Sequence, residues 1–167
     1  MELKEWKVRI GDDFHCHLRK EEMLADVLHH TAKQFKRALI MPNIDPPVLN
    51  GKDAMNYRDS ILSLLPEKSF EPLMTIQITR DTTKKTVREA FKMGVVAGKL
   101  YPEGVTNSKN GVSDFEKICP IFEEMQKIGM VLSIHGEIIV EGDIFCLEGE
   151  KRFLPILKKK HAKIFQH

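Results

Sequence analysis

DDFHCHLR, residues 12–19, places two histidines one position apart, with aspartates before them and an arginine after them. If this segment is a β-strand, successive side chains point to opposite faces of the sheet. One face then carries only polar and charged groups: Asp13, His15, His17 and Arg19. The apolar residues between them point to the other face. A polar face of this kind on a strand calls for a functional explanation.

Strand-like and helix-like segments alternate along the rest of the chain. Strands are expected at an apolar run, 6–10, that leads into the HxH segment, and then at 36–43, 71–79, 95–101, 130–137 and 161–167. Helices are expected between them at 21–35, 51–65, 83–94, 112–129 and 150–160. In the 112–129 helix, Ser113 and Asp114 form a cap, and Pro120 should kink the helix or mark its start.

This order of about six strands and five helices favours a parallel α/β protein. A (βα)8 barrel of the TIM type needs eight strands and roughly 250 residues, whereas the chain has 167. A doubly wound sheet could close with six strands. Both architectures place functional residues at the carboxyl ends of their strands.

The composition excludes several classes of protein. Hydrophobic residues make up 42% and charged residues 30%, which is ordinary for one globular domain. A net charge of +2 gives no electrostatic argument for a nucleic-acid or membrane partner. No stretch approaches the ~20 apolar residues of a transmembrane helix, and the first residues lack the apolar core of a secretory signal. Because the three cysteines form no CxxC pair, a reduced, cytoplasmic protein is expected.

Most of the predicted strands end in a distinctive polar residue. The set comprises His15 and His17, Asn43, Lys99 with Tyr101, His135 and His167. Neutral imidazole is the commonest transition-metal ligand in proteins, so histidines that converge on one rim predict a metal site. Taken alone, His135 also fits a hydrogen-bonded strand end, and His167 fits an ordinary terminal residue.

Two cationic residues on this rim each have two interpretations. A Lys99 ammonium has no lone pair and repels a cation, so it is either an ordinary ion-paired lysine or a lysine that reacts with carbon dioxide. The resulting carbamate can bridge two metals as a carboxylate does. Arg19 either pairs with Asp13 or a loop acid, or presents a planar guanidinium to a substrate carboxylate.

Five motifs now point to a family. DDFHCHLR, MPNIDPP (41–47), AGKLYPEGVTNS (97–108), IHGE (134–137) and FQH (165–167) resemble dihydroorotases of the bacterial single-function type, in the same order and with similar spacings. HxH alone is shared by the whole amidohydrolase superfamily. The combination is far more specific, and it extends over nearly the whole chain.

The resemblance implies a (βα)8 TIM-type barrel with two zinc ions at its carboxyl-end rim. By position, His15 and His17 would bind one zinc, His135 and His167 the other, and a carboxylated Lys99 would bridge them. The implied reaction is the reversible cyclisation of N-carbamoyl-L-aspartate to L-dihydroorotate in pyrimidine biosynthesis, with the metals activating water and polarising the amide carbonyl. The substrate would be held by Arg19, Asn43 and, from a mobile lid over 102–111, Thr106.

The chain departs from the family in two respects. The lid is short, with Val105 in place of a first threonine before Thr106. The family continues for two more strands and a helical tail, which carry an aspartate that acts as general base. Residues 1–167 are therefore expected to form a metal-dependent amidohydrolase barrel domain truncated after strand six, about the first two-thirds of the enzyme, and to be inactive alone.

Two other functions remain open at this point. One is another cyclic-amide hydrolase, such as a hydantoinase or allantoinase. The other is an inactive dihydroorotase-like binding or scaffold protein. Arg19 directly after HxH, MPN at the second strand and KLYP at the fourth favour dihydroorotase. The resemblance also implies a homodimer that acts on a small-molecule substrate, with no nucleic-acid or membrane partner.

Overall fold

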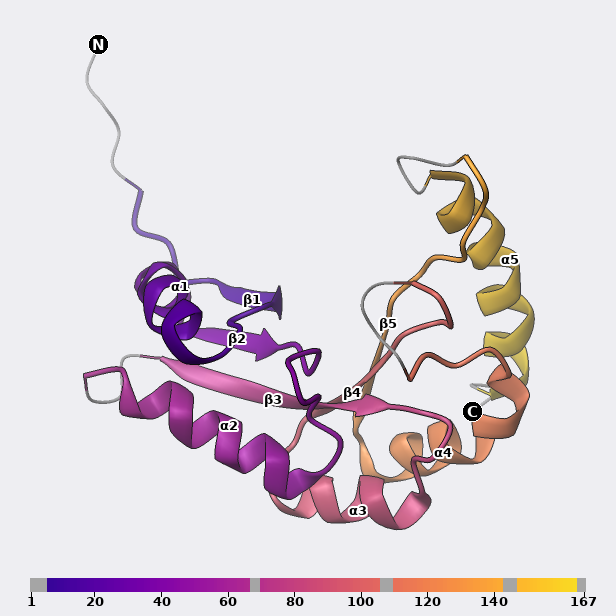
Figure 1. Ribbon diagram of the computed structural model, residues 1–167, viewed down its shortest axis with the longest axis horizontal. Helices are drawn as coiled ribbons and strands as arrows, with labels where there is room; N and C mark the ends of the chain where they lie inside the picture. Colours follow the sequence, from indigo (N-terminus) through magenta and orange to yellow (C-terminus); the bar gives the residue numbers. More distant parts are fainter. Residues whose placement is uncertain (1–5, 67–69, 106–109, 143–146, 165–167) are drawn as a thin grey trace.

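The computed structural model describes residues 6–66, 70–105, 110–142 and 147–164. Strands and helices alternate along the chain (Figure 1). The strands are β1 (Asp12–Cys16), β2 (Arg37–Ile40), β3 (Glu71–Ile78), β4 (Ala97–Leu100) and β5 (Val131–Ile134). The helices are α1 (Glu21–Gln34), α2 (Gly51–Ser63), α3 (Lys84–Lys92), α4 (Phe115–Ile128) and α5 (Leu147–Ile164).

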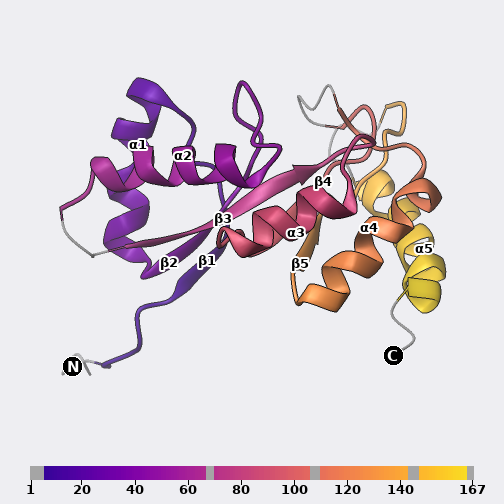
Figure 2. The same ribbon diagram turned by 90° about the horizontal axis from the view of Figure 1, so that it is seen from below.

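The strands form one parallel sheet in the order β1-β2-β3-β4-β5, so each strand pairs with its neighbour in sequence. The sheet is curved, with β1 and β5 as its two edges, and it has the shape of a half-barrel (Figures 1 and 2). This arrangement confirms the TIM-type α/β class and excludes the doubly wound alternative, in which the strand order would reverse.

Two of the predicted strand regions are wrong. Residues 161–164 continue α5 instead of forming a sixth strand, and 165–167 lie outside the described residues. Phe153, Leu157 and Ile164 are spaced by four and seven residues, which also fits a helix. The apolar pattern of 161–167 is too short to distinguish a helix from a strand. The apolar run at 6–10 precedes β1 and is exposed, not part of the strand.

The sheet packs differently on its two faces. Between the sheet and the helices lies the larger hydrophobic core, to which Met74, Ile76 and Ile78 of β3 contribute. A smaller cluster of Leu39, Met41 and Ala97 lies on the other, concave face. Because side chains alternate along β4, Lys99 shares the concave face with Ala97.

The end signals of α4 are those that the sequence predicts. The side chain of Asp114 accepts hydrogen bonds from the backbone N–H groups of Glu116 and Lys117, and Gly129 ends the helix at φ 76°. Pro120 lies inside the helix and does not start it. No helix in the described ranges combines the length and apolar character needed to cross a membrane.

Candidate functional site

A β-bulge in β1 sets the direction of the first two candidate ligands. Asp13 pairs with Ala38 and Cys16 with Ile40, so three steps along β1 match two along β2. Ala38 and Ile40 both belong to the helix-side core. By this pairing, the side chain of Asp13 belongs to the helix-facing side of the sheet. This corrects the prediction that Asp13 shares a face with His15 and His17. Its carboxylate instead accepts a 2.9 Å hydrogen bond from the backbone N–H of His15.

The two histidines of the HxH motif point toward a common spot. The Nε2 atoms of His15 and His17 lie 3.1 Å apart. Two imidazoles bound to one tetrahedral zinc at about 2.05 Å place their nitrogens roughly 3.3 Å apart. Burial lowers the pKa of His15, with further lowering by the charge of Lys99; burial and the charge of His15 lower the pKa of His17. Both shifts favour the neutral form of imidazole, which is the form that binds metals.

Lys99 lies at the centre of the site. It is the third residue of β4, is 1% exposed, and pairs in register with Gln77 of β3. Burial lowers its pKa and so favours the neutral amine. Its Nζ atom lies 5.3 Å from the centre of the Tyr101 ring.

His135 directly follows β5 and approaches from the other side. Its ring centre lies 6.0 Å from that of Tyr101, and its charge lowers the pKa of His15. Its Nε2 atom lies 2.6 Å from a carboxylate oxygen of Glu137. A carboxylate in this position orients the imidazole ring.

Arg19 and Asn43, the two predicted substrate-binding residues, lie on the same rim. The side chain of Asn43 lies within hydrogen-bonding reach of His17, and the charge of Arg19 acts on both His17 and Tyr101. The amide oxygen of Asn43 and the hydroxyl of Tyr101 are buried, with no hydrogen-bond partner in the described part of the chain. Buried polar atoms normally have partners, so these two indicate room for a polar ligand.

The two remaining predicted residues, His167 and Thr106, lie outside the described residues. Among the described residues, no group of three or more His, Cys, Asp or Glu side chains is arranged to hold a metal ion. Lysine is not one of these four residue types. The described donors nevertheless fit a metal centre, because two facing imidazoles, a third imidazole directly after β5 and a buried amine that favours its neutral form lie on one rim.

Sequence reasoning missed two residues that shape the site. Glu137 is part of the IHGE motif, and an acid two positions after a strand-end histidine is the signal that could have identified it. Gln77 is 2% exposed and lies beside Lys99 in the sheet. Only the pairing register between β3 and β4 identifies it, and no local pattern encodes that register.

Comparison with known proteins places this geometry in context. No protein-family profile matches the chain. The dihydroorotase of Marinobacter nauticus is 49% identical over 144 residues, which covers 86% of this chain and 42% of the relative. The dihydroorotase of Neisseria meningitidis serogroup C is 50% identical over 140 residues, 82% of this chain and 41% of the relative. The chain thus spans about two-fifths of these relatives, less than the two-thirds that the resemblance implies.

Solved structures give the same result. The dihydroorotase of Campylobacter jejuni matches 92% of this chain and 45% of its own, with a TM-score of 0.82 and 34% identity. The Saccharomyces cerevisiae dihydroorotase, in complex with 5-fluoroorotic acid, matches 93% of this chain and 45% of its own, with a TM-score of 0.83 and 34% identity. An L-hydantoinase from Arthrobacter aurescens, which this chain matches over 92% of its length and 32% of the hydantoinase, shares the fold alone, at 16% identity and a TM-score of 0.63. In sequence and in fold, the chain is a relative of the dihydroorotases.

Proposed function

We propose that the protein is a metal-dependent dihydroorotase, which interconverts N-carbamoyl-L-aspartate and L-dihydroorotate. Similarity of about 50% to curated dihydroorotases over more than four-fifths of the chain supports this reaction over hydantoin hydrolysis. The chain spans about two-fifths of the length of these relatives.

The observation that carries the proposal is the environment of Lys99. An amine that is 1% exposed is costly as a cation, and the charge of Lys99 acts on the imidazoles of His15 and His17. As a neutral amine it can add to the carbon of carbon dioxide and lose one proton, which gives a carbamate anion. A negative group at this position would suit cations on either side of it.

The assignment of ligands follows from the strands. His15 and His17 would hold one zinc ion, and His135 with His167 would hold a second, with the Lys99 carbamate between them. When bound, the ions would act as Lewis acids toward the amide carbonyl and lower the pKa of a water molecule. His135 would be kept in orientation by Glu137, whose carboxylate lies against its ring.

The substrate would be held from the β1 and β2 side of the rim. The Arg19 guanidinium would pair with the substrate carboxylate, since a planar fork of N–H donors matches two carboxylate oxygens. The unpartnered amide oxygen of Asn43 would accept a hydrogen bond from a substrate N–H. Thr106 would contact the substrate from the 102–111 loop.

The test is a comparison of L-dihydroorotate and hydantoin as substrates of the natural full-length protein, with metal content measured on the same sample. We expect turnover of dihydroorotate at about 1 s⁻¹ or faster, little turnover of hydantoin, and about two zinc ions per chain. A preference for hydantoin, or folded protein that holds no metal, would contradict the proposal.

The same assay applied to Lys99→Met tests the role of the lysine. Methionine fills a similar volume but cannot form a carbamate, so we expect activity to fall about a thousandfold or more and the zinc content to drop. Lys92→Met, an exposed change at the end of α3, is the matched control and should leave both unchanged.

A further inference from the structure

The segment that joins β1 to α1 has an unusual backbone. Arg19 has φ 60° and Glu21 has φ 52°, so both occupy the left-handed region without being glycine. Side chains with a Cβ atom are disfavoured there, and such conformations persist only where the surroundings hold them in place. The guanidinium that would meet the substrate therefore extends from a backbone that needs support.

Several contacts among the described residues hold this segment. The hydroxyl of Tyr57 donates a 2.6 Å hydrogen bond to the carbonyl oxygen of Arg19. The Nζ atom of Lys20 donates to the carbonyl oxygen of Asp45 at 3.2 Å, but its side chain is more exposed to solvent. On the strand side, Leu18 is 1% exposed and anchors the chain in the core. Among these contacts, the one from Tyr57 acts on Arg19 itself.

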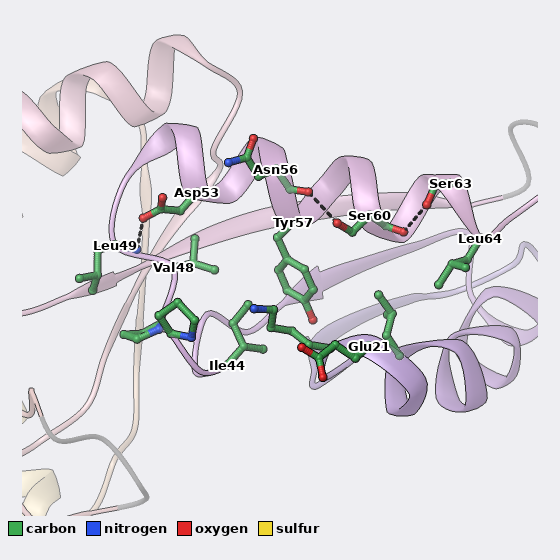
Figure 3. Close-up of a pocket in the computed structure, with 14 residues that line it drawn as sticks. Glu21, Ile44, Val48, Leu49, Asp53, Asn56, Tyr57, Ser60, Ser63 and Leu64 are labelled. Carbon is green, nitrogen blue, oxygen red and sulfur yellow. Dashed lines mark hydrogen bonds between the residues drawn. The ribbon is translucent and has the colours of Figure 1, made fainter.

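Tyr57 is well placed to act as a fixed donor. It is 5% exposed and projects from α2 across a pocket of about 700 Å³ toward the segment that carries Glu21 (Figure 3). Burial raises the pKa of Tyr57, so the hydroxyl keeps its proton throughout the physiological range. The pocket is lined by residues of α1, of α2 and of the loop that precedes α2.

We propose that Tyr57 is a positioning residue for recognition of the substrate carboxylate. It fixes the carbonyl of Arg19 and thereby the direction in which the guanidinium extends over the rim toward His17 and Tyr101. This inference rests on the proposed function. It adds a residue of α2, outside the rim itself, that sets substrate affinity and leaves the metal centre untouched.

Tyr57→Phe in the natural full-length protein removes the hydroxyl and keeps the ring. We expect the KM for dihydroorotate to rise about three- to tenfold, the effect of losing one buried hydrogen bond, with kcat and zinc content unchanged. The methyl ester of dihydroorotate lacks the carboxylate charge, so its kcat/KM should not change. In an Arg19→Ala background, Tyr57→Phe should have no further effect.

Ser60→Ala is the matched control, because the Ser60 hydroxyl lines the same pocket but bonds to the Asn56 carbonyl within α2. It should leave the KM unchanged. Equal effects of Tyr57→Phe on the acid and the ester, an additive effect in the Arg19→Ala background, or loss of folding would each assign Tyr57 a general structural role and overturn the inference. If the wild type were inactive on dihydroorotate, both the proposed function and this inference would be overturned. If the wild type were active and Tyr57→Phe had the same KM, this inference alone would be overturned.

Discussion

At the scale of single residues, burial of Lys99 predicts that stability depends on pH. Its amine is buried on the concave face, and burial lowers its pKa from the ordinary value of 10.5. The unfolded chain therefore binds a proton more readily than the folded chain in the interval between the lowered pKa and 10.5. The free energy of unfolding should rise with pH across that interval and be lowest below it.

This pH dependence can be tested on metal-free protein in buffer depleted of carbon dioxide. We expect the midpoint of urea unfolding to rise from neutral pH toward pH ~9.5, and Lys99→Met to show a smaller rise because it has no proton to lose. Lys92→Met again serves as control and should follow the wild type. If Lys99→Met and the wild type gave the same slope, Lys99 would titrate normally in the folded protein.

The placement of most candidate site residues on one rim is predictable from the sequence, because the carboxyl ends of parallel strands meet there. That rule identifies His15, His17, Lys99 and His135 from local patterns alone. It does not give the orientation of Asp13, since one extra residue in β1 reverses the alternation on which the prediction depends. It does not identify Tyr57 either, because its contact with Arg19 spans 38 residues.

At the scale of elements, the contact between β4 and its covering helix depends on Gly98. A Cβ atom there would lie 2.7 Å from Ile78 Cδ1 and 2.8 Å from Met125 Cε. The side chain of Gly98 thus points into the helix-side core, and its absence lets α4 and β3 pack closely around β4. The position of Lys99, the next residue, depends on this packing.

Gly98→Ala should therefore destabilise the protein by about 1–3 kcal/mol through overpacking, and it should also lower zinc content by displacing Lys99. Urea unfolding and elemental analysis measure the two effects. Gly11→Ala is the control, because a Cβ atom there would meet nothing within 4 Å. Equal stability of the two variants would show that the side chains of Ile78 and Met125 move aside with no loss of free energy of unfolding.

Helix ends were better predicted than the last element of the chain. Asp114 and Gly129 are local signals, a side-chain acceptor and a residue free to adopt positive φ, and they need no tertiary information. Residues 161–164 have no such signal. Whether they extend α5 or begin a strand depends on contacts that a short pattern does not encode.

At the scale of the whole molecule, both edges of the sheet carry exposed apolar side chains. Trp6, Val8 and Phe14 lie along or before β1 and are 82%, 83% and 77% exposed, and Val131 of β5 is 57% exposed. Parallel strands with open edges and apolar flanks favour association with other chains.

Residues 1–167 prepared alone should therefore associate as concentration rises, as measured by light scattering. Phe14→Lys combined with Val131→Lys should reduce the association, because charge at a sheet edge opposes edge-to-edge pairing. Leu154→Lys is the control, since Leu154 is 62% exposed on α5 and belongs to neither edge strand. If the control reduced association as much as the edge variant, the edges would not be the contact surface.

The extra residue in β1 has a consequence for anyone who would transplant this site. Before the bulge, Asp12 lies opposite Arg37 in the regular register and accepts a 3.0 Å hydrogen bond from its guanidinium. Beyond Asp13, the imidazoles of His15 and His17 face each other. If the HxH tripeptide were grafted onto a regular strand, its residues would pair with different residues of the neighbouring strand. A functional graft has to carry the irregularity and the Asp13 carboxylate that secures it, so the smallest portable unit is the segment 12–17.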